Sequence, residues 1–425
     1  MASVRSEARP TVYAADWVLP VVAPPIRDGA VVVEGDRIAW IGPARELPAQ
    51  YGPAAAGRGI LAPGLVNAHT HLQYSGFAEI GRGSYTSFED WSDAFGRVYD
   101  VTDRSSWREA ALHGARLAIA SGTTVFAEIV TDDEARGAVP SCGGGGIEYL
   151  EAIGQFEHLW DNGGRADFLR WLDAPTRALR GVSPHAAYSL DGAVIADLME
   201  IAAARGLRVH SHLGESSVEA ELYRNGDRRV LAAYGDLRDE FELVRKGGAG
   251  HTTGEYADSV GLLGPTTHVA HAIYLDRAER DLLLRRGTQV ALCPRSNAVI
   301  GLDRAPVADY LREGHEIAVG TDSLASSPSL DLLEDVRELY EIAREQGYDR
   351  ADLAARLVRA ATVGGASAMG LAARGYGALA PGGPADLALF DVGEVVAGQA
   401  EEALVRRGAG TCVLTVAGGR VLHER

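Results

Sequence analysis

Short apolar runs alternate with amphipathic stretches through the middle of the chain. The apolar runs are 59–71, 122–129, 146–154, 178–189, 207–216, 267–275, 288–297 and 316–326. Between them, stretches such as 107–121, 193–205, 277–286 and 330–346 place apolar residues at the 3.6-residue period of a helix. This alternation is typical of βαβ units, and eight of them predict an α/β fold, a closed parallel (β/α)8 TIM barrel.

Both ends of the chain follow a different pattern. Residues 11–18, 29–34 and 37–41, and again 385–390 and 411–421, form short alternating runs separated by turn residues. We therefore expect the two termini, 1–58 and 375–425, to join into one small β-sandwich that supports a barrel spanning 59–374.

The composition narrows the class of protein and of partner. At 425 residues with 46% apolar content, the chain is long enough for a barrel of about 250 to 300 residues plus a smaller domain. A net charge of −17 argues against nucleic acid as the main partner, because binding phosphates requires clustered Lys and Arg. No run approaches the roughly 18 apolar residues of a membrane helix, and residues 1–17 contain no apolar signal segment. We expect a cytoplasmic protein that binds a small molecule, and neither nucleic acid nor a membrane.

Seven of the 12 histidines fall within the eight apolar runs, where a plain barrel would have Val, Ile or Leu. They are His69, His71, His185, His210, His212, His268 and His271. Catalytic groups of such barrels come from the C-terminal ends of the strands. His69 and His71 lie two apart on one strand and therefore share a face. Together with His212, His271 and Asp322 from other runs, they form a donor set that suits a divalent ion, with a water completing its shell.

Six ordered motifs strengthen this interpretation. They are PGLVNAHTHL (63–72), SPHAAYS (183–189), HSHLGES (210–216), HVAHAIYL (268–275), CPRSN (293–297) and GTDSLAS (320–326). The chain resembles the amidohydrolase superfamily, and within it the branch of mononuclear-metal nucleoside and nucleobase deaminases and triazine-type chlorohydrolases. With the two terminal segments, the resemblance covers nearly the whole chain, although it does not identify the substrate.

The resemblance implies a role for each residue of the cluster. His69, His71, His212 and Asp322 are implied ligands of one divalent metal ion, zinc as first choice and iron as the alternative, because nitrogen and oxygen ligands accept either. Glu215 is implied to carry protons to the ring nitrogen and the departing amine, with His271 and Asp322 as its catalytic partners. His185 resembles the family histidine that hydrogen-bonds the substrate.

Absent residues exclude two related arrangements. Family members with two metals use a carboxylated lysine at the end of the fourth strand, before the fifth-strand histidine. Here the only lysine, Lys246, follows His212, so the resemblance implies a single metal. The separate zinc deaminase fold requires P-C-x-x-C, and Cys142, Cys293 and Cys412 lie far apart without any C-x-x-C spacing.

The substrate pocket is expected between two long segments, 73–106 and 216–266, which follow strand ends. Gln73, Tyr74 and Trp91 are candidates for contacting a heteroaromatic ring, and Arg82 and Arg295 are candidates for pairing with a substrate carboxylate. For each of these residues a structural role remains an open alternative.

Segments 69–77 and 320–336 resemble deaminases of 6-amino-6-deoxyfutalosine, an adenosine-like, benzoate-bearing intermediate of a menaquinone biosynthesis route in high-GC bacteria. Arginine makes up 40 of the 41 basic residues, which fits such a host. The resemblance therefore makes 6-amino-6-deoxyfutalosine the first substrate prediction, and its benzoate predicts an arginine in the pocket.

Several alternatives stay open. They are methylthioadenosine or S-adenosylhomocysteine deaminase, then 8-oxoguanine or guanine deaminase, then a triazine-type chlorohydrolase. A barrel that has lost catalysis and only binds is a remote alternative, because all four implied ligands and Glu215 are present. Barrels of this branch are often dimers, so a homodimer is the expected assembly, although no interface patch is identifiable in the sequence.

Overall fold

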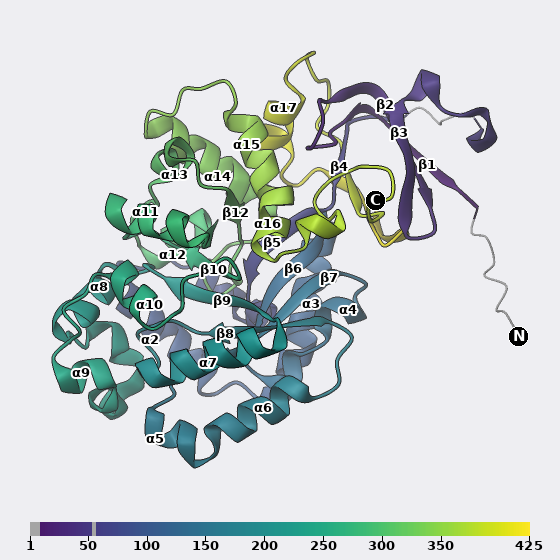
Figure 1. Cartoon of the computed structure of the whole chain (residues 1–425). Helices are drawn as coiled ribbons and strands as arrows, with labels where there is room; N and C mark the ends of the chain where they lie inside the picture. The colour runs from purple at the N-terminus through teal and green to yellow at the C-terminus, as the bar shows by residue number, and fades with distance from the viewer. Residues whose placement is uncertain (1–8, 53–56) are drawn as a thin grey trace, which may run out of the picture.

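An eight-stranded parallel sheet forms the centre of the larger part of the molecule (Figure 1). The computed structural model describes residues 9–52 and 57–425. The eight strands, each hydrogen-bonded to the next in chain order, are β5 (Leu65–Thr70), β6 (Thr123–Val130), β7 (Gly145–Ala152), β8 (Leu179–Pro184), β9 (Arg208–Leu213), β10 (Thr267–His271), β11 (Gln289–Leu292) and β12 (Ile317–Val319). Each predicted apolar run overlaps one of these strands, with β6 and β7 each extending one residue beyond their runs, and the predicted (β/α)8 barrel is confirmed.

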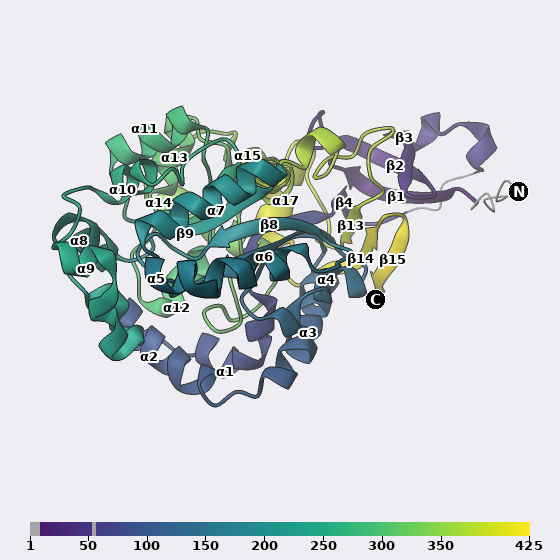
Figure 2. The same ribbon diagram turned by 60° about the horizontal axis from the view of Figure 1, so that its bottom comes forward.

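Helices follow the strands and surround the barrel (Figure 2). They are α1 (Ala78–Gly81), α2 (Phe88–Tyr99), α3 (Trp107–Ala120), α4 (Ala138–Ser141), α5 (Glu157–Leu159), α6 (Arg165–Asp173), α7 (Gly192–Arg205), α8 (Ser217–Asn225), α9 (Glu242–Lys246), α10 (Thr253–Ser259), α11 (Arg277–Arg286), α12 (Pro294–Ile300), α13 (Val307–Glu313), α14 (Leu332–Glu345), α15 (Leu353–Arg359), α16 (Gly365–Ala368) and α17 (Ala400–Arg407). The four predicted amphipathic stretches correspond to α3, α7, α11 and α14. Helix α11 starts with a capping box, in which the Asp276 side chain accepts from the Glu279 N–H and the Glu279 side chain accepts from the Asp276 N–H.

The barrel closes between β5 and β12, at the C-terminal ends of these strands. Thr70 forms an isolated parallel bridge with Asp322, and the Asp322 N–H donates to the His69 carbonyl at 3.0 Å. Gly320 allows this close approach, because a Cβ there would lie 2.7 Å from the His69 Cβ and 2.9 Å from the Cys293 Sγ. The residues that close the barrel are therefore next to, or among, the predicted metal ligands.

The two termini meet in a second sheet of seven strands, as predicted. Its order is β15-β14-β13-β4-β1-β2-β3, and the strands are β1 (Thr11–Val18), β2 (Ile26–Glu34), β3 (Arg37–Pro43), β4 (Ile60–Pro63), β13 (Leu387–Phe390), β14 (Cys412–Ala417) and β15 (Arg420–Glu424). This sheet has a small hydrophobic core of its own, which includes Val18, Val31 and Leu387. Figure 1 shows it at one side of the barrel, beside the C-terminus.

The first predicted apolar run, 59–71, is divided between the two sheets. Ile60–Pro63 pairs with β1 and β13 in the terminal sheet, and Leu65–Thr70 is the first barrel strand. Gly64 connects them, and a Cβ at this position would lie 2.2 Å from the Thr124 Oγ1. Residues 1–8 and 53–56 of the predicted domain 1–58 lie outside the described residues. Within the described part of the chain, no helix is long and apolar enough to cross a membrane.

Candidate metal centre and active site

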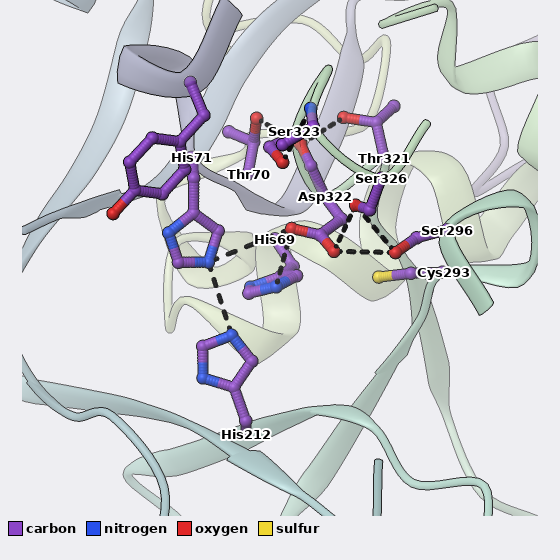
Figure 3. A network of polar contacts seen from close by, with 12 residues as sticks. His69, Thr70, His71, His212, Cys293, Ser296, Thr321, Asp322, Ser323 and Ser326 are labelled. Atoms are coloured by element: carbon purple, nitrogen blue, oxygen red, sulfur yellow. Dashed lines mark hydrogen bonds and ion pairs between the residues drawn. The ribbon is translucent and has the colours of Figure 1, made fainter. Parts of the chain in front are cut away.

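The predicted metal ligands converge at the C-terminal end of the barrel (Figure 3). The Nε2 atoms of His71 and His212 are 3.3 Å apart, and the Asp322 Oδ1 lies 3.7 Å from the His69 Nε2 and 3.9 Å from the His71 Nε2. Within the set His69, His71 and His212, and within the set His69, His271 and Asp322, the candidate ligand atoms lie no more than 4.8 Å apart. All these side chains are buried. Five groups from four strand ends therefore surround one small volume.

A chain of hydrogen bonds determines which nitrogen of His69 carries the proton. The His210 Nδ1 lies 3.1 Å from the His268 carbonyl, which can only accept, so this Nδ1 carries the hydrogen. In a neutral ring the His210 Nε2 must then accept, and its partner at 2.8 Å is the His69 Nδ1. The His69 Nδ1 is thus protonated, and a lone pair remains on its Nε2, which has no hydrogen-bond partner among the described residues.

Two further histidines are oriented in the same way. The His212 Nδ1 lies 2.7 Å from the His185 carbonyl, so it donates, and its Nε2 lone pair faces His71. The His271 Nδ1 lies 3.0 Å from the Asn297 Oδ1, and the His271 Nε2 has no partner among the described residues. Nitrogen lone pairs therefore point at a common centre, which is the arrangement that a metal ion requires.

Burial keeps these imidazoles neutral. It is the largest cause of the lowered pKa at His69, His212 and His271, and at His69 the neighbouring histidines lower the pKa further. A neutral imidazole is the form that binds a metal. The unpartnered buried nitrogens and the absence of protons on them fit a divalent cation at this position.

Asp322 has one oxygen bound to the protein and one directed at the histidines. The hydroxyls of Ser296 and Ser326 donate to its Oδ2 at 2.7 and 2.8 Å, and Oδ1 faces His69 and His71. Burial acts to raise the pKa of Asp322, but His71, His271 and the two hydroxyls outweigh it, so the pKa is lowered and the carboxylate is ionised. Asp322 also has a φ of 57°, and His271 has a φ of 69°. Such left-handed conformations of non-glycine residues are strained and concentrate at functional sites.

Glu215 lies beside this cluster and faces the cavity. Its Oε1 is 3.5 Å from the His271 Nε2, and its side chain is 7% exposed. Burial raises the pKa of Glu215 to about 7, with His212 acting to lower it and Asp322 to raise it. A carboxyl group that titrates near neutral pH can both donate and accept a proton during one reaction cycle.

A cavity of about 340 Å³ opens onto the cluster. Both segments that were predicted to form its walls line it, 73–106 through α2 and 216–266 through residues such as Val230 and Tyr234. Its aromatic lining consists of Tyr74, Phe88, Trp91, Phe95, Tyr99, Tyr188 and Tyr234. Among the lining residues that the structure describes, the acidic ones are Asp100, Glu151, Glu215 and Asp322, and none is Arg or Lys.

The structure brings three of the six predicted substrate contacts to this cavity. His185, Tyr74 and Trp91 line it. The Tyr74 hydroxyl donates to the Thr131 Oγ1 at 3.2 Å, and the Trp91 indole N–H donates to the Ala325 carbonyl at 2.9 Å. These two hydrogen bonds hold both rings in position in the cavity wall.

The other three predicted contacts lie elsewhere. Gln73 is fully buried, where its amide donates to Asp132 and accepts from the backbone N–H groups of Thr131 and Asp132. Arg82 is exposed and pairs with Glu79.

Arg295 is also bound within the protein. Its guanidinium donates to Asp335 at 2.8 and 3.1 Å, to Glu334 and to the Ser329 hydroxyl and carbonyl. Because its donors are occupied by these groups, it links α12 to α14 and does not line the cavity.

The sequence interpretation missed several residues at this site. Ser296, Ser326 and Asn297 orient Asp322 and His271, and Glu151 lies in the cavity wall. Glu151 carried a signal, because a carboxylate near the end of an apolar barrel strand is as unexpected as a histidine there. Ser296 and Asn297 lie in the CPRSN motif and Ser326 lies in GTDSLAS, so the motifs marked these segments but not the role of each side chain.

Comparison with known proteins places the chain in a family. The sequence profile of the Amidohydrolase family matches residues 60–422, and a profile described as an imidazolonepropionase-like composite domain of bacteria matches residues 29–54.

Individual relatives match over most of their length. A 5-methylthioadenosine/S-adenosylhomocysteine deaminase of Nitratidesulfovibrio vulgaris is 30% identical over 387 residues, 86% of this chain and 80% of the relative. An aminodeoxyfutalosine deaminase of Deinococcus radiodurans is 30% identical over 360 residues, 80% of this chain and 81% of the relative. Among solved structures, an adenosine deaminase from Xanthomonas campestris with bound Zn superposes with a TM-score of 0.79 at 23% identity, covering 97% of this chain and 92% of that one. This structural likeness shows the fold.

Proposed function

Since the chain belongs to the amidohydrolase family and hydrolyses C–N bonds in cyclic amidines, we propose that it is a hydrolytic deaminase of an adenosine-type nucleoside. The observation that carries the proposal is the position of Glu215, with a pKa near 7, between a convergent histidine and aspartate cluster and an aromatic cavity.

We propose that His69, His71, His212 and Asp322 hold one divalent ion, with zinc as the first choice. A bound ion of this kind lowers the pKa of water toward about 7 and so supplies a hydroxide nucleophile at neutral pH. The orphaned Nε2 of His69 and the free Oδ1 of Asp322 support this donor set.

Glu215 and His271 then have complementary tasks. Addition of water to the amino-bearing ring carbon requires a proton on the adjacent ring nitrogen, and protonated Glu215 faces the cavity to donate it. The departing amino group needs a second proton to leave as ammonia, which Glu215 can relay after accepting one from the attacking water. The His271 Nε2, 3.5 Å from Glu215 Oε1, holds a lone pair that can orient the water.

The lining of the cavity favours a neutral group on the sugar of the substrate. The aromatic side chains suit a purine and an apolar 5′ substituent. None of the described lining residues is Arg or Lys, so the cavity offers a substrate carboxylate no guanidinium or ammonium group to pair with. Methylthioadenosine has the required properties and is our first candidate.

A second candidate is 6-amino-6-deoxyfutalosine. It is favoured by the Deinococcus radiodurans relative and by the aromatic wall, on which a phenyl ring can pack. The arginine predicted for its benzoate is not among the described lining residues, and Arg295 and Arg82 are engaged elsewhere.

The test is metal analysis combined with ammonia release. We expect one tightly bound zinc or iron per chain, and turnover of at least one adenosine-type nucleoside in a panel that also includes 8-oxoguanine, guanine, pterins and triazines. Glu215→Gln should retain the metal and lose at least about 100-fold in kcat. The exposed Glu157→Gln is the matched control and should retain full activity. A metal-free protein, an inert one or a Glu215→Gln variant with near-normal kcat would refute the proposal.

A further inference from the structure

Glu151 is a buried carboxylate in the cavity wall that the proposed chemistry does not use. It lies at the penultimate position of β7 and is 5% exposed. Its Oε2 accepts a hydrogen bond from the Thr131 hydroxyl at 2.7 Å. Its Oε1 has no hydrogen-bond partner among the described residues. A buried carboxylate oxygen without a donor is costly, so the site is incomplete until a donor reaches it.

His185, which lies close to Glu151 in the cavity wall, also presents a hydrogen-bond acceptor. The Ser189 hydroxyl donates to the Ala186 carbonyl at 3.0 Å, so it accepts from the His185 Nδ1 at 2.8 Å. A neutral His185 with a hydrogen on Nδ1 has its lone pair on Nε2, and burial lowers its pKa and keeps it neutral. Candidate ligand atoms of Glu151, His185 and His212 lie within 4.8 Å of one another. This part of the wall therefore offers acceptors side by side.

The chemistry of the substrate limits which donor can meet this wall. When the amino group and adjacent ring nitrogen of an adenine face the metal cluster and Glu215, the rest of the ring has acceptor nitrogens and C–H groups only. The remaining O–H donors of a neutral adenosine-type substrate are the hydroxyls of its sugar. On this basis, which rests on the proposed function, we propose that Glu151 binds a sugar hydroxyl through Oε1 and thereby selects ribonucleosides.

Electrostatics supports the same assignment. Burial raises the pKa of Glu151 to about 8, with Asp132 and Asp322 contributing, so the surroundings stabilise its charge poorly. A hydroxyl donated to Oε1 stabilises the carboxylate.

The test measures whether the loss in kcat/KM on removing a sugar hydroxyl depends on the Glu151 side chain. Deamination of adenosine, 2′-deoxyadenosine and 3′-deoxyadenosine is compared in the metal-loaded wild type, Glu151→Gln and Glu151→Ala. In the wild type, removal of the bound hydroxyl should lower kcat/KM by about 10- to 100-fold. In Glu151→Ala this penalty should disappear, and in Glu151→Gln, which keeps a neutral acceptor, it should be intermediate. Equal penalties in all three proteins, or no penalty in the wild type, would overturn the inference.

Glu148→Gln is the matched control. Glu148 is also a buried glutamate of β7, but it accepts from the Gly137 N–H and the Thr176 hydroxyl and does not line the cavity. It should show the wild-type penalty.

Measuring the number of bound metal ions tests whether Glu151 is instead a metal ligand. Wild type and Glu151 variants should each bind one ion, and a second ion that only the wild type binds would show that Glu151 is a metal ligand and overturn the inference. A wild type that deaminates no adenosine-type nucleoside would instead refute the proposed function.

Discussion

At the scale of single residues, backbone carbonyls decide how the site is assembled. The His268 carbonyl orients His210, which orients His69, and the His185 carbonyl orients His212. A backbone carbonyl can only accept a hydrogen bond, so the ring nitrogen that faces it must carry the hydrogen, and the ring is fixed in one tautomer. This explains the position of His210 beneath the cluster. Because its Nδ1 donates to a backbone carbonyl, its Nε2 must accept from His69, and the other nitrogen of His69 is left free to bind a metal.

His210 is therefore predicted to set the metal affinity without contacting the metal. In His210→Phe the His69 Nδ1–H loses its acceptor, and the ring is no longer held in the tautomer with a free Nε2. We expect metal binding to weaken by about 10- to 100-fold, measured by competition with a chromogenic chelator. His210→Gln, whose amide oxygen can accept, should recover part of the affinity.

The exposed His113→Phe is the control for this prediction and should bind metal as the wild type does. Unchanged affinity in His210→Phe would mean that packing alone orients His69.

At the scale of elements, the helices were predictable because each buries one face, and the barrel strands were predictable as short apolar runs because both of their faces are buried. Helix α11 has the predicted bounds, and β1 does as well. The run 59–71 was the exception, because two consecutive strands buried on both faces produce one continuous apolar pattern. Only Gly64 marked the change of sheet.

The convergence of the candidate ligands could be predicted because these histidines and the aspartate lie at or near the ends of barrel strands. His69 lies near the end of β5, His71 directly follows β5 and Asp322 follows β12, and the barrel brings these strand ends together. The direction of a long side chain on a loop or helix is not encoded in such a pattern. Gln73 and Arg295 stand beside the site in sequence but turn to buried acidic partners, which no periodicity reveals.

Arg295 is predicted to stabilise the fold by holding α12 against α14. Its side chain is 12% exposed and that of Asp335 is fully buried. Arg295→Met leaves the Asp335 carboxylate without its ion pair, and removing one partner of a buried pair typically costs about 3 to 5 kcal/mol. We expect a loss of this size in the free energy of unfolding, measured by urea titration.

Arg82→Met tests the same change at an exposed pair and should have little effect, since surface ion pairs contribute little. A stable Arg295→Met variant with altered substrate preference would instead indicate that Arg295 reaches the substrate.

At the scale of the whole molecule, the active site is also where the barrel closes. Strands β5 and β12 stand at opposite ends of the sheet order and meet at the Thr70 to Asp322 bridge. The Thr70 hydroxyl donates to the Asp322 carbonyl at 2.9 Å, which reinforces the junction. The proposed ligands His69 and Asp322 lie on the two sides of this junction, whereas His212 belongs to β9 across the barrel. An ion bound by all of them would connect the two edges of the sheet with its middle.

Removal of the metal should therefore loosen the barrel at this junction before it affects the rest. An ion that binds only the folded state stabilises it by about 2.7 kcal/mol at 100 times its Kd, so chelation should lower the Tm. Hydrogen exchange should rise first at Thr321 and Asp322, because their N–H groups donate to the Asn67 side chain and the His69 carbonyl in the bonds that close the barrel. The terminal sheet, with its own core, serves as the internal control, and β1 to β3 should keep their protection. If exchange rises uniformly across both sheets, or not at all near Asp322, then the ion does not join β5 to β12, and the ligand set proposed for it must be revised.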